Sequence, residues 1–207
     1  MNRPGSSFRR AAPRYKAQPR VLIICEDSKS SLIYLKDAAR YFRSYAEIEI
    51  LHSGNTDPMG IVRQCAARKR QYDSVYGVID RDDHIGFDKA MQLAAQAEVN
   101  LIVTYPCYEY WLLLHFRKTR APCRSVGAQS AGDRMVALLR NERGMEDYAK
   151  GEANGVFLKL LERLPLARQR AVEVLADAEV DGEPNPSTRL HELVGLLQQL
   201  GDPQSLA

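Results

Sequence analysis

The stretch VYGVIDRDDHIGFDKA, residues 75–90, decides the fold class, because an apolar run ends there in a group of charged residues. Val75, Val78 and Ile79 are typical of a buried strand. The residues that follow are Asp80, Arg81, Asp82, Asp83 and His84. Three carboxylates in such a short segment repel one another unless solvent or a cation compensates their charge. The stretch therefore indicates either a solvated turn or a cation site at the end of a buried strand.

Alternating strands and helices surround this stretch. Apolar and β-branched runs predict strands at residues 20–25, 46–51, 74–79 and 100–105. Segments with helical spacing follow the strands, and Asp27, Ser28 and Ser30 are suitable caps for the first of them. Residues 46–51 alternate apolar and acidic side chains, so we expect an edge strand there. Four strand–helix repeats are typical of a parallel sheet covered by helices.

The chain changes character after Tyr108. Residues 109–116, EYWLLLHF, are apolar enough for a strand or a helix, and both assignments stay open. Helical spacing returns at residues 133–142, 154–164, 167–178 and 187–200, and we expect Ser187 to cap the last of these helices. The sequence thus predicts an α/β fold, with a parallel sheet of about four strands flanked by helices and a helical C-terminal extension.

Composition suggests one domain with a basic tail. A chain of 207 residues that is 45% hydrophobic can form one core, which we place at residues 21–207, with an α/β core at 21–116 and a helical part at 117–207. Residues 1–20 hold six of the 29 Lys and Arg residues and no acid, which leaves 23 basic against 26 acidic residues in the remainder. The residues expected to bind nucleic acid are Arg9, Arg10, Arg14 and Lys16. A flexible tail that only aids solubility explains the composition equally well.

The apolar segments and the cysteines indicate the cellular compartment of the protein. None of the apolar runs approaches the roughly 20 residues that span a bilayer, and the N-terminus lacks the apolar region of a secretory signal. The four cysteines lie far apart, without a C-x-x-C pair, which favours free thiols in a reducing compartment. We expect a cytoplasmic protein without membrane contact.

Acidic residues follow three of the predicted strands. Glu26 follows the first strand, Asp80 and Asp82 follow the third, and Glu109 comes shortly after the fourth. Because the carboxyl ends of parallel strands meet at one edge of a sheet, we expect these carboxylates to lie close together. Carboxylate oxygens are ligands for Mg²⁺ or Mn²⁺, so the pattern predicts a metal site. Turn formation alone is the alternative explanation of the Asp-x-Asp sequence.

Other ligand classes are less well supported. The segment CEDSKSS after the first strand contains no glycine, so it cannot be a dinucleotide-binding fingerprint, and no phosphate-binding loop motif is present. A phospho-acceptor receiver module remains a weaker alternative, because Glu26 and Asp27 at the end of the first strand come close to its pair of acids. His84 could contact a phosphate or lie in a surface loop, and Lys29 and Lys150 are further candidates for phosphate contact. We expect Arg81 to point away from the metal and pair with an acid.

Four stretches resemble the RloB family of Toprim-type prokaryotic defence proteins, which are related to the OLD-family nucleases. They are VLIICEDSKSSLIYLK (21–36), VIDRDDH (78–84), YPCYEYWLLLHF (105–116) and NPSTRLHELV (185–194). The resemblance implies a Toprim-like fold in which Asp80 and Asp82 bind the metal and Glu26 is an acid/base or a further ligand. Glu109 would be an added acid beside that site. It also implies an Mg²⁺- or Mn²⁺-dependent nuclease that cuts DNA or RNA, including transfer RNA, in antiviral defence.

The resemblance also implies partners and an alternative. A nuclease of this kind would be gated by an ATPase of the same operon, and a homo-oligomer stays open. Two positions depart from the family pattern, because Asp27 stands where glycine is usual and Ser31 where a glutamate is frequent. A side chain at position 27 would narrow the approach to Glu26, and the loss of an acid at 31 would remove a second metal site. These departures favour the rival interpretation, a non-catalytic regulatory or nucleic-acid-binding subunit.

Overall fold

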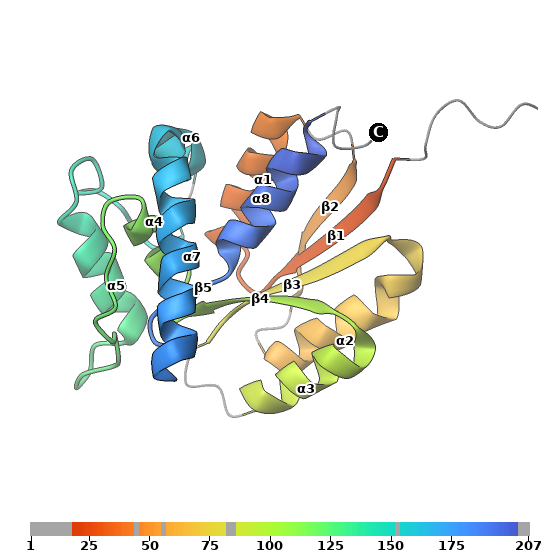
Figure 1. Cartoon of the computed structure of the whole chain (residues 1–207), viewed down its shortest axis with the longest axis horizontal. Coiled ribbons are helices and arrows are strands. Elements are labelled where there is room, and N and C mark those ends of the chain that lie inside the picture. Colours follow the sequence, from red (N-terminus) through yellow and green to blue (C-terminus); the bar gives the residue numbers. More distant parts are fainter. Residues whose placement is uncertain (1–17, 44–45, 55–56, 82–85, 152–153, 203–207) are drawn as a thin grey trace, which may run out of the picture.

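A five-stranded sheet runs through the molecule (Figure 1). The structure, a computed structural model, describes residues 18–43, 46–54, 57–81, 86–151 and 154–202. The strands are β1 (Arg20–Cys25), β2 (Glu47–His52), β3 (Ser74–Asp80), β4 (Asn100–Tyr105) and β5 (Ser187–Thr188), in the order β2-β1-β3-β4-β5. The first four strands are parallel, and β5 pairs antiparallel with β4. The predicted parallel sheet and the edge position of β2 are confirmed.

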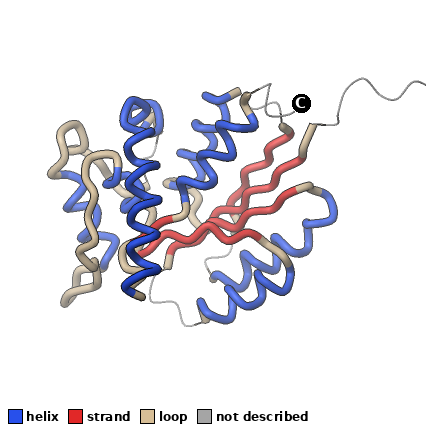
Figure 2. The backbone as a smooth tube through the Cα atoms, in the orientation of Figure 1, coloured by secondary structure: helices blue, strands red, loops and turns tan. Residues whose placement is uncertain are grey.

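Helices cover both faces of the sheet. They are α1 (Ser31–Phe42), α2 (Pro58–Arg68), α3 (Phe87–Ala97), α4 (Glu109–Leu114), α5 (Ala131–Arg140), α6 (Val156–Leu160), α7 (Leu164–Asp181) and α8 (Leu190–Leu200), with 3₁₀ turns η1 (Lys69–Gln71) and η2 (Leu161–Arg163). Helices α2 and α3 pack on one face, and α1 and α8 pack on the other (Figures 1 and 2). Helices α4 to α7 lie beyond the carboxyl ends of the strands, on the left of Figure 1.

The side chains of β1 show why the sheet is central. Val21 and Ile23 belong to the core under α1 and α8, whereas Leu22 and Ile24 belong to the core under α2 and α3. All four are almost fully buried, because a parallel strand with helices on both sides has no solvent face. This two-sided burial explains why the strand reads as a continuous apolar run.

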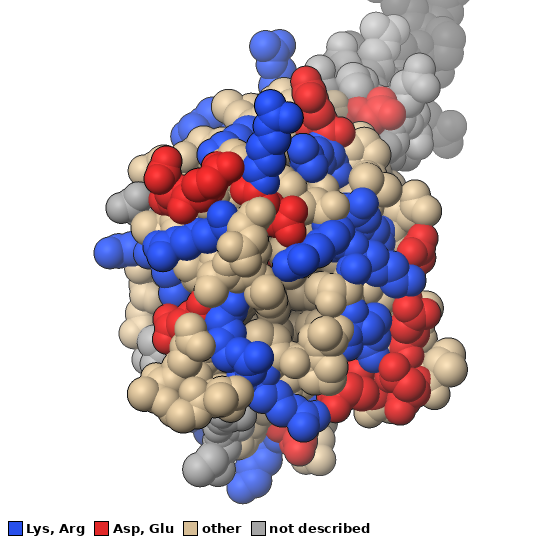
Figure 3. All heavy atoms as spheres, turned by 90° about the vertical axis from the view of Figure 1, so that its left-hand side faces the viewer, with Lys and Arg blue, Asp and Glu red and all other residues tan. Residues whose placement is uncertain are grey.

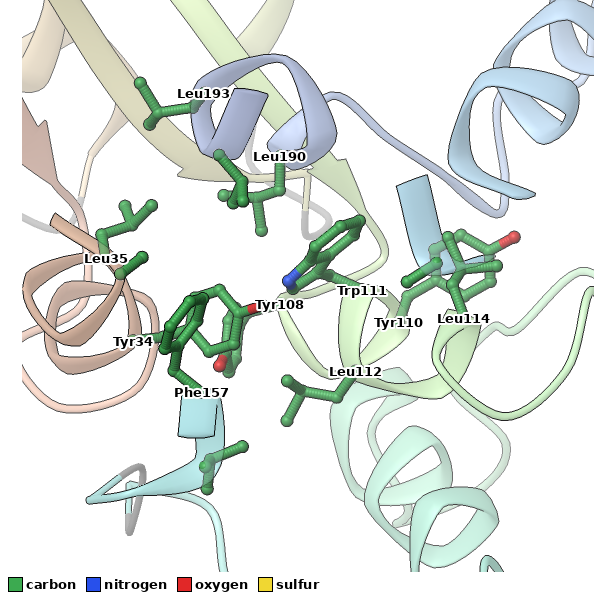
Figure 4. Packing of buried hydrophobic residues seen from close by; sticks show 14 of the residues in the cluster. Tyr34, Leu35, Tyr108, Tyr110, Trp111, Leu112, Leu114, Phe157, Leu190 and Leu193 are labelled. Atoms are coloured by element: carbon green, nitrogen blue, oxygen red, sulfur yellow. The ribbon is translucent and has the colours of Figure 1, made fainter. Parts of the chain in front are cut away.

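An aromatic cluster joins the sheet layer to the C-terminal helices (Figure 4). The ring of Tyr34 in α1 makes edge-to-face contacts with Phe157, Tyr108 and Trp111, at centroid distances of 5.2, 5.9 and 6.4 Å. Such pairs each add about 0.5–1.5 kcal/mol beyond the burial of their area. All residues of α4 are buried, so residues 109–114, whose assignment stayed open, form a helix inside this core.

The start of α8 differs from the prediction. Ser187 does not cap this helix, because it lies in β5, and α8 begins at Leu190. The hydroxyl group of Thr188 accepts the N–H of Leu190 at 3.2 Å and lies 2.8 Å from the hydroxyl of Thr104 in β4. A two-residue strand is too short to give a periodic pattern, so β5 could not be predicted.

None of the helices in the described residues is long and apolar enough to cross a membrane.

Candidate functional site

The end of the β1–β3 ladder holds Glu26 beside Asp80. The N–H of Glu26 donates to the carbonyl oxygen of Val78 at 3.0 Å, which extends the ladder one residue beyond β1. The N–H of Asp80 then donates to Oε2 of Glu26 at 2.9 Å. The backbone of β3 thereby fixes the side chain of Glu26, which follows the neighbouring strand β1.

Asp80 lies in an environment that disfavours its charge. Burial raises the pKa of its carboxyl group well above the usual range, and the nearby charges of Glu109 and Glu26 raise it further. A hydrogen bond from the backbone of Tyr108 acts in the opposite direction. The carboxyl groups of Glu26, Asp80 and Glu109 are therefore close enough to influence one another. They come from the end of β1, the end of β3 and the segment after β4, as their positions in the sequence predicted.

Glu109 enters this neighbourhood from the start of α4. Its side chain is buried, and the hydroxyl group of Tyr148 donates a hydrogen bond to Oε1 at 3.2 Å. Burial and the Glu109 charge raise the pKa of the Cys107 thiol, which therefore stays protonated and is a poor ligand or nucleophile. Sequence reasoning identified Glu109 but had no signal for Tyr148, which is far away in the chain.

The donor chemistry fits a hard divalent cation. Glu26, Asp80 and Glu109 offer only carboxylate oxygens, which suit Mg²⁺ or Mn²⁺ rather than a thiolate-binding metal. Within the described residues, no group of three His, Cys, Asp or Glu side chains is arranged to hold a metal ion by itself. The predicted ligand Asp82 and the phosphate candidate His84 lie outside the described residues, as do Arg9, Arg10, Arg14 and Lys16 of the tail. The described carboxylates thus supply part of the predicted donor set.

Asp27 is used by the helix that follows it. Its carboxylate accepts the backbone N–H groups of Lys29 and Ser31, each at 2.9 Å, and that of Ser30. The Ser31 hydroxyl also donates to Asp27. The prediction that Asp27 caps α1 is confirmed, whereas Ser30 makes no side-chain cap. The two positions that depart from the family pattern are therefore hydrogen-bonded to each other.

A pocket of about 540 Å³ opens at the carboxyl ends of β3 and β4, where Arg81 and Tyr105 line it. Its lining consists of Arg81, Tyr105, Pro106, Cys123, Arg124, Ser125, Ser130, Ala131, Gly132, Lys150 and Asn185. Three of these side chains are cationic and none is acidic. Figure 3 shows Lys and Arg side chains around a hollow on the side of the molecule where α4, α5 and α7 lie. The pocket therefore places positive charge at the same strand ends, since Arg81 directly follows Asp80 in the chain.

The two candidate lysines lie in neighbouring segments. Lys150, a predicted candidate for phosphate contact, lines the pocket. The aliphatic part of Lys29 lies against Gly151, where an added Cβ atom would be 3.3 Å from Cδ of the lysine. Both lysines are exposed, and Nζ of Lys150 lies 3.0 Å from the position that a Cβ atom on Gly132 would take.

Arg81 contacts aromatic rings, and Asp82 and Asp83, which follow it in the chain, lie outside the described residues. The Arg81 guanidinium lies over the rings of Phe87 and Tyr105, with distances of 4.6 and 5.1 Å to the ring centroids, and it lines the pocket; none of the ion pairs among the described residues includes it. Aromatic residues that are distant in the chain provide these contacts, so the local sequence gave no indication of them. Arg124 was also missed, because it belongs to an irregular loop without a motif.

A known protein family matches the part of the chain that contains this site. The family model described as RloB-like protein matches residues 21–197. The chain belongs to the RloB-like family. The match begins in β1 and ends in α8, so it includes the three acidic residues and the whole lining of the pocket. No curated protein and no solved structure matches the chain.

Proposed function

We propose that this RloB-like chain is a metal-dependent nuclease with a Toprim-type centre, which acts in prokaryotic antiviral defence. The observation that carries the proposal is the common neighbourhood of Glu26, Asp80 and Glu109, where burial and then the charges of Glu109 and Glu26 raise the pKa of Asp80. Uncompensated carboxylates in such a place are unfavourable, and a divalent cation removes the repulsion. The cationic pocket beside them adds a surface for a polyanionic substrate.

Each residue has a defined role in the proposed reaction. Asp80 and Glu26, together with Asp82, would hold Mg²⁺ or Mn²⁺, and Glu109 would support them. When bound, the ion neutralises charge on the phosphodiester and lowers the pKa of a coordinated water. Glu26, which the N–H of Asp80 orients, would accept the proton of the attacking water. Arg81 and Lys150 would hold the sugar–phosphate backbone.

The substrate and partner remain part of the proposal. DNA and RNA, including transfer RNA, are both compatible with contacts made to phosphate groups. An ATPase of the same operon is the proposed partner that gates cutting. A chain that binds nucleic acid but does not cut it would be a regulatory subunit, the rival function.

The full chain is tested by incubation with plasmid DNA, single-stranded DNA and total RNA, with and without the ATPase of its operon. Cutting should require Mg²⁺ or Mn²⁺ and stop in EDTA. Glu26→Gln and Asp80→Asn should lower the cutting rate by about 10²- to 10⁴-fold. The exposed Glu179 on α7 provides a control, Glu179→Gln, which should cut at the wild-type rate. Absence of cutting in every mixture, with folded protein and the partner present, would establish the regulatory alternative.

A further inference from the structure

We infer that the pocket lined by Arg81, Arg124 and Lys150 binds the sugar–phosphate of the nucleotide next to the cut phosphodiester. The inference rests on the proposed nuclease function and adds to it the part of the substrate that this pocket holds.

The pocket and the acidic residues share the same strand ends. Arg81 directly follows Asp80, and its N–H donates to the carbonyl oxygen of Thr104 at 2.8 Å, which extends the β3–β4 ladder. Tyr105 and Pro106, which also line the pocket, precede Glu109 by only a few residues. A strand of nucleic acid with one phosphate at the carboxylates would therefore have its next phosphate at the pocket.

The cations come from three separate segments. Arg81 extends from the end of β3, Arg124 from the loop before α5, and Lys150 from the segment after α5. Two aromatic rings hold the Arg81 guanidinium, and none of the ion pairs found among the described residues involves it. Arg124 pairs with Glu183 at 2.6 Å at the exposed rim. Arg81 thus presents a positioned cation whose planar donors suit a phosphate group.

The wall of the pocket is fixed by its own hydrogen bonds. The buried side chain of Asn185 accepts the N–H of Cys123 at 3.1 Å and donates to its carbonyl oxygen at 3.0 Å. Ser130 and Asp133 form a capping box, so they already satisfy donors at the start of α5. These polar groups hold the wall together, and the Arg81 guanidinium and Ser125 line the space that a ligand would enter. A preformed pocket of this volume is typical of sites for small groups, which span about 300–1,000 Å³.

The residues that line the pocket favour contacts with the sugar–phosphate backbone of a nucleic acid over recognition of its bases. Its apolar members, Pro106, Cys123 and Ala131, are small, and the Tyr105 ring already carries the Arg81 guanidinium. Cations that contact phosphate groups give binding that is strong at low salt and independent of base sequence. The occupant is therefore a sugar–phosphate unit of DNA or RNA.

The test is a binding titration in EDTA, which separates binding from cutting. Fluorescently labelled RNA and DNA oligonucleotides of matched sequence are titrated with the full chain, at several salt concentrations. Arg81→Gln and Lys150→Gln should each bind about tenfold more weakly at low salt. The slope of log K against log salt should also decrease by about one for each lost contact. Arg70→Gln makes the same charge change in the exposed part of η1, which precedes β3, and should match the wild type.

The outcomes separate this inference from the nuclease proposal. Wild-type affinity and slope in both pocket variants would overturn the inference, even if the protein cuts. Weaker oligonucleotide binding by both variants than by the wild type would support the inferred role of the pocket, even if no cutting is found. Circular dichroism checks that Arg81→Gln folds, and Lys150→Gln tests the same pocket from another segment. Tighter binding of adenosine 5′-monophosphate than of the oligonucleotides would contradict a substrate strand as occupant.

Discussion

The N–H of Asp80 donates a hydrogen bond to Oε2 of Glu26 at 2.9 Å, so the last residue of β3 orients the acid that follows β1. Residues Cys25 and Val78 are partners in the parallel register of these strands. A slip of one residue would turn the side chains of a strand to the opposite face, and the two buried cores prevent this. Core packing on both faces of the sheet therefore positions the acidic residues.

Tyr148→Phe tests how Glu109 is held. Removing the hydroxyl group takes a donor away from the buried Glu109 carboxylate, so the free energy of unfolding should fall by about 1–3 kcal/mol. Urea unfolding measures the change. Tyr41→Phe removes a hydroxyl from a ring that is 47% exposed and should leave stability within about 0.5 kcal/mol of the wild type. Equal stability of both variants would mean that the Tyr148 hydroxyl does not hold Glu109.

Asp27→Ala tests the cap of α1. Three backbone N–H groups and the Ser31 hydroxyl lose their acceptor, so the protein should lose about 0.5–2 kcal/mol of stability. Ser31→Ala should lose less, and the double variant should be less destabilised than the sum of the two, because they share one hydrogen bond. Chemical unfolding of the four proteins gives this cycle. Strict additivity would show that the two side chains are not coupled.

His115 should make stability depend on pH. Burial lowers its pKa to about 4, whereas the unfolded value is near 6.5. The ring stays neutral in the folded protein at pH values where the unfolded chain takes up a proton. Stability from this residue is therefore complete above about pH 6.5 and is lost as the pH falls towards 4, by about 3 kcal/mol in total.

Urea unfolding between about pH 7 and pH 4.5 measures this dependence. His115→Gln should reduce the loss of stability on acidification, whereas the exposed His52→Gln should keep it. An identical pH dependence in all three proteins would contradict a buried neutral histidine.

Two glycines of the α8 region should respond differently to alanine. A Cβ atom on Gly201 would overlap the backbone carbonyl oxygen of Phe42, which cannot move without shifting α1. Gly201→Ala should therefore destabilise the protein by about 1–3 kcal/mol. At Gly195 the Cβ atom would lie 2.8 Å from the movable end of Arg168, and alanine favours a helix, so stability should be kept or raised. Thermal unfolding compares the stability of the two variants with that of the wild type. An equal loss of stability in both variants would contradict this packing.

Periodic segments could be predicted from the sequence because their burial is regular. The apolar run of β1 and the alternation in β2 have direct counterparts in the sheet, where one strand is central and the other lies at the edge. Because the carboxyl ends of parallel strands meet at one edge of a sheet, the proximity of Glu26, Asp80 and Glu109 could be predicted without knowledge of any contact. These predictions depend on local pattern and on the topology of parallel sheets.

Features that depend on distant contacts could not be predicted. The Tyr148 hydroxyl contacts Glu109 across 39 positions of the chain, and the rings of Phe87 and Tyr105 hold the Arg81 guanidinium. Helix α4 is buried on all sides, so its apolar run has no periodicity to separate helix from strand. The sequence signal fails in these places because the tertiary packing, and not the local chain, determines the conformation.

The most direct test of the shared ion is a titration of the full chain with Mn²⁺, in which the signal of free Mn²⁺ is followed by electron paramagnetic resonance. The wild type and the exposed-site control Glu179→Gln should bind the ion equally, and Glu26→Gln and Asp80→Asn should each weaken binding by about tenfold or more. Equal binding by all four proteins, or none by the wild type, would contradict a metal centre formed by Glu26 and Asp80.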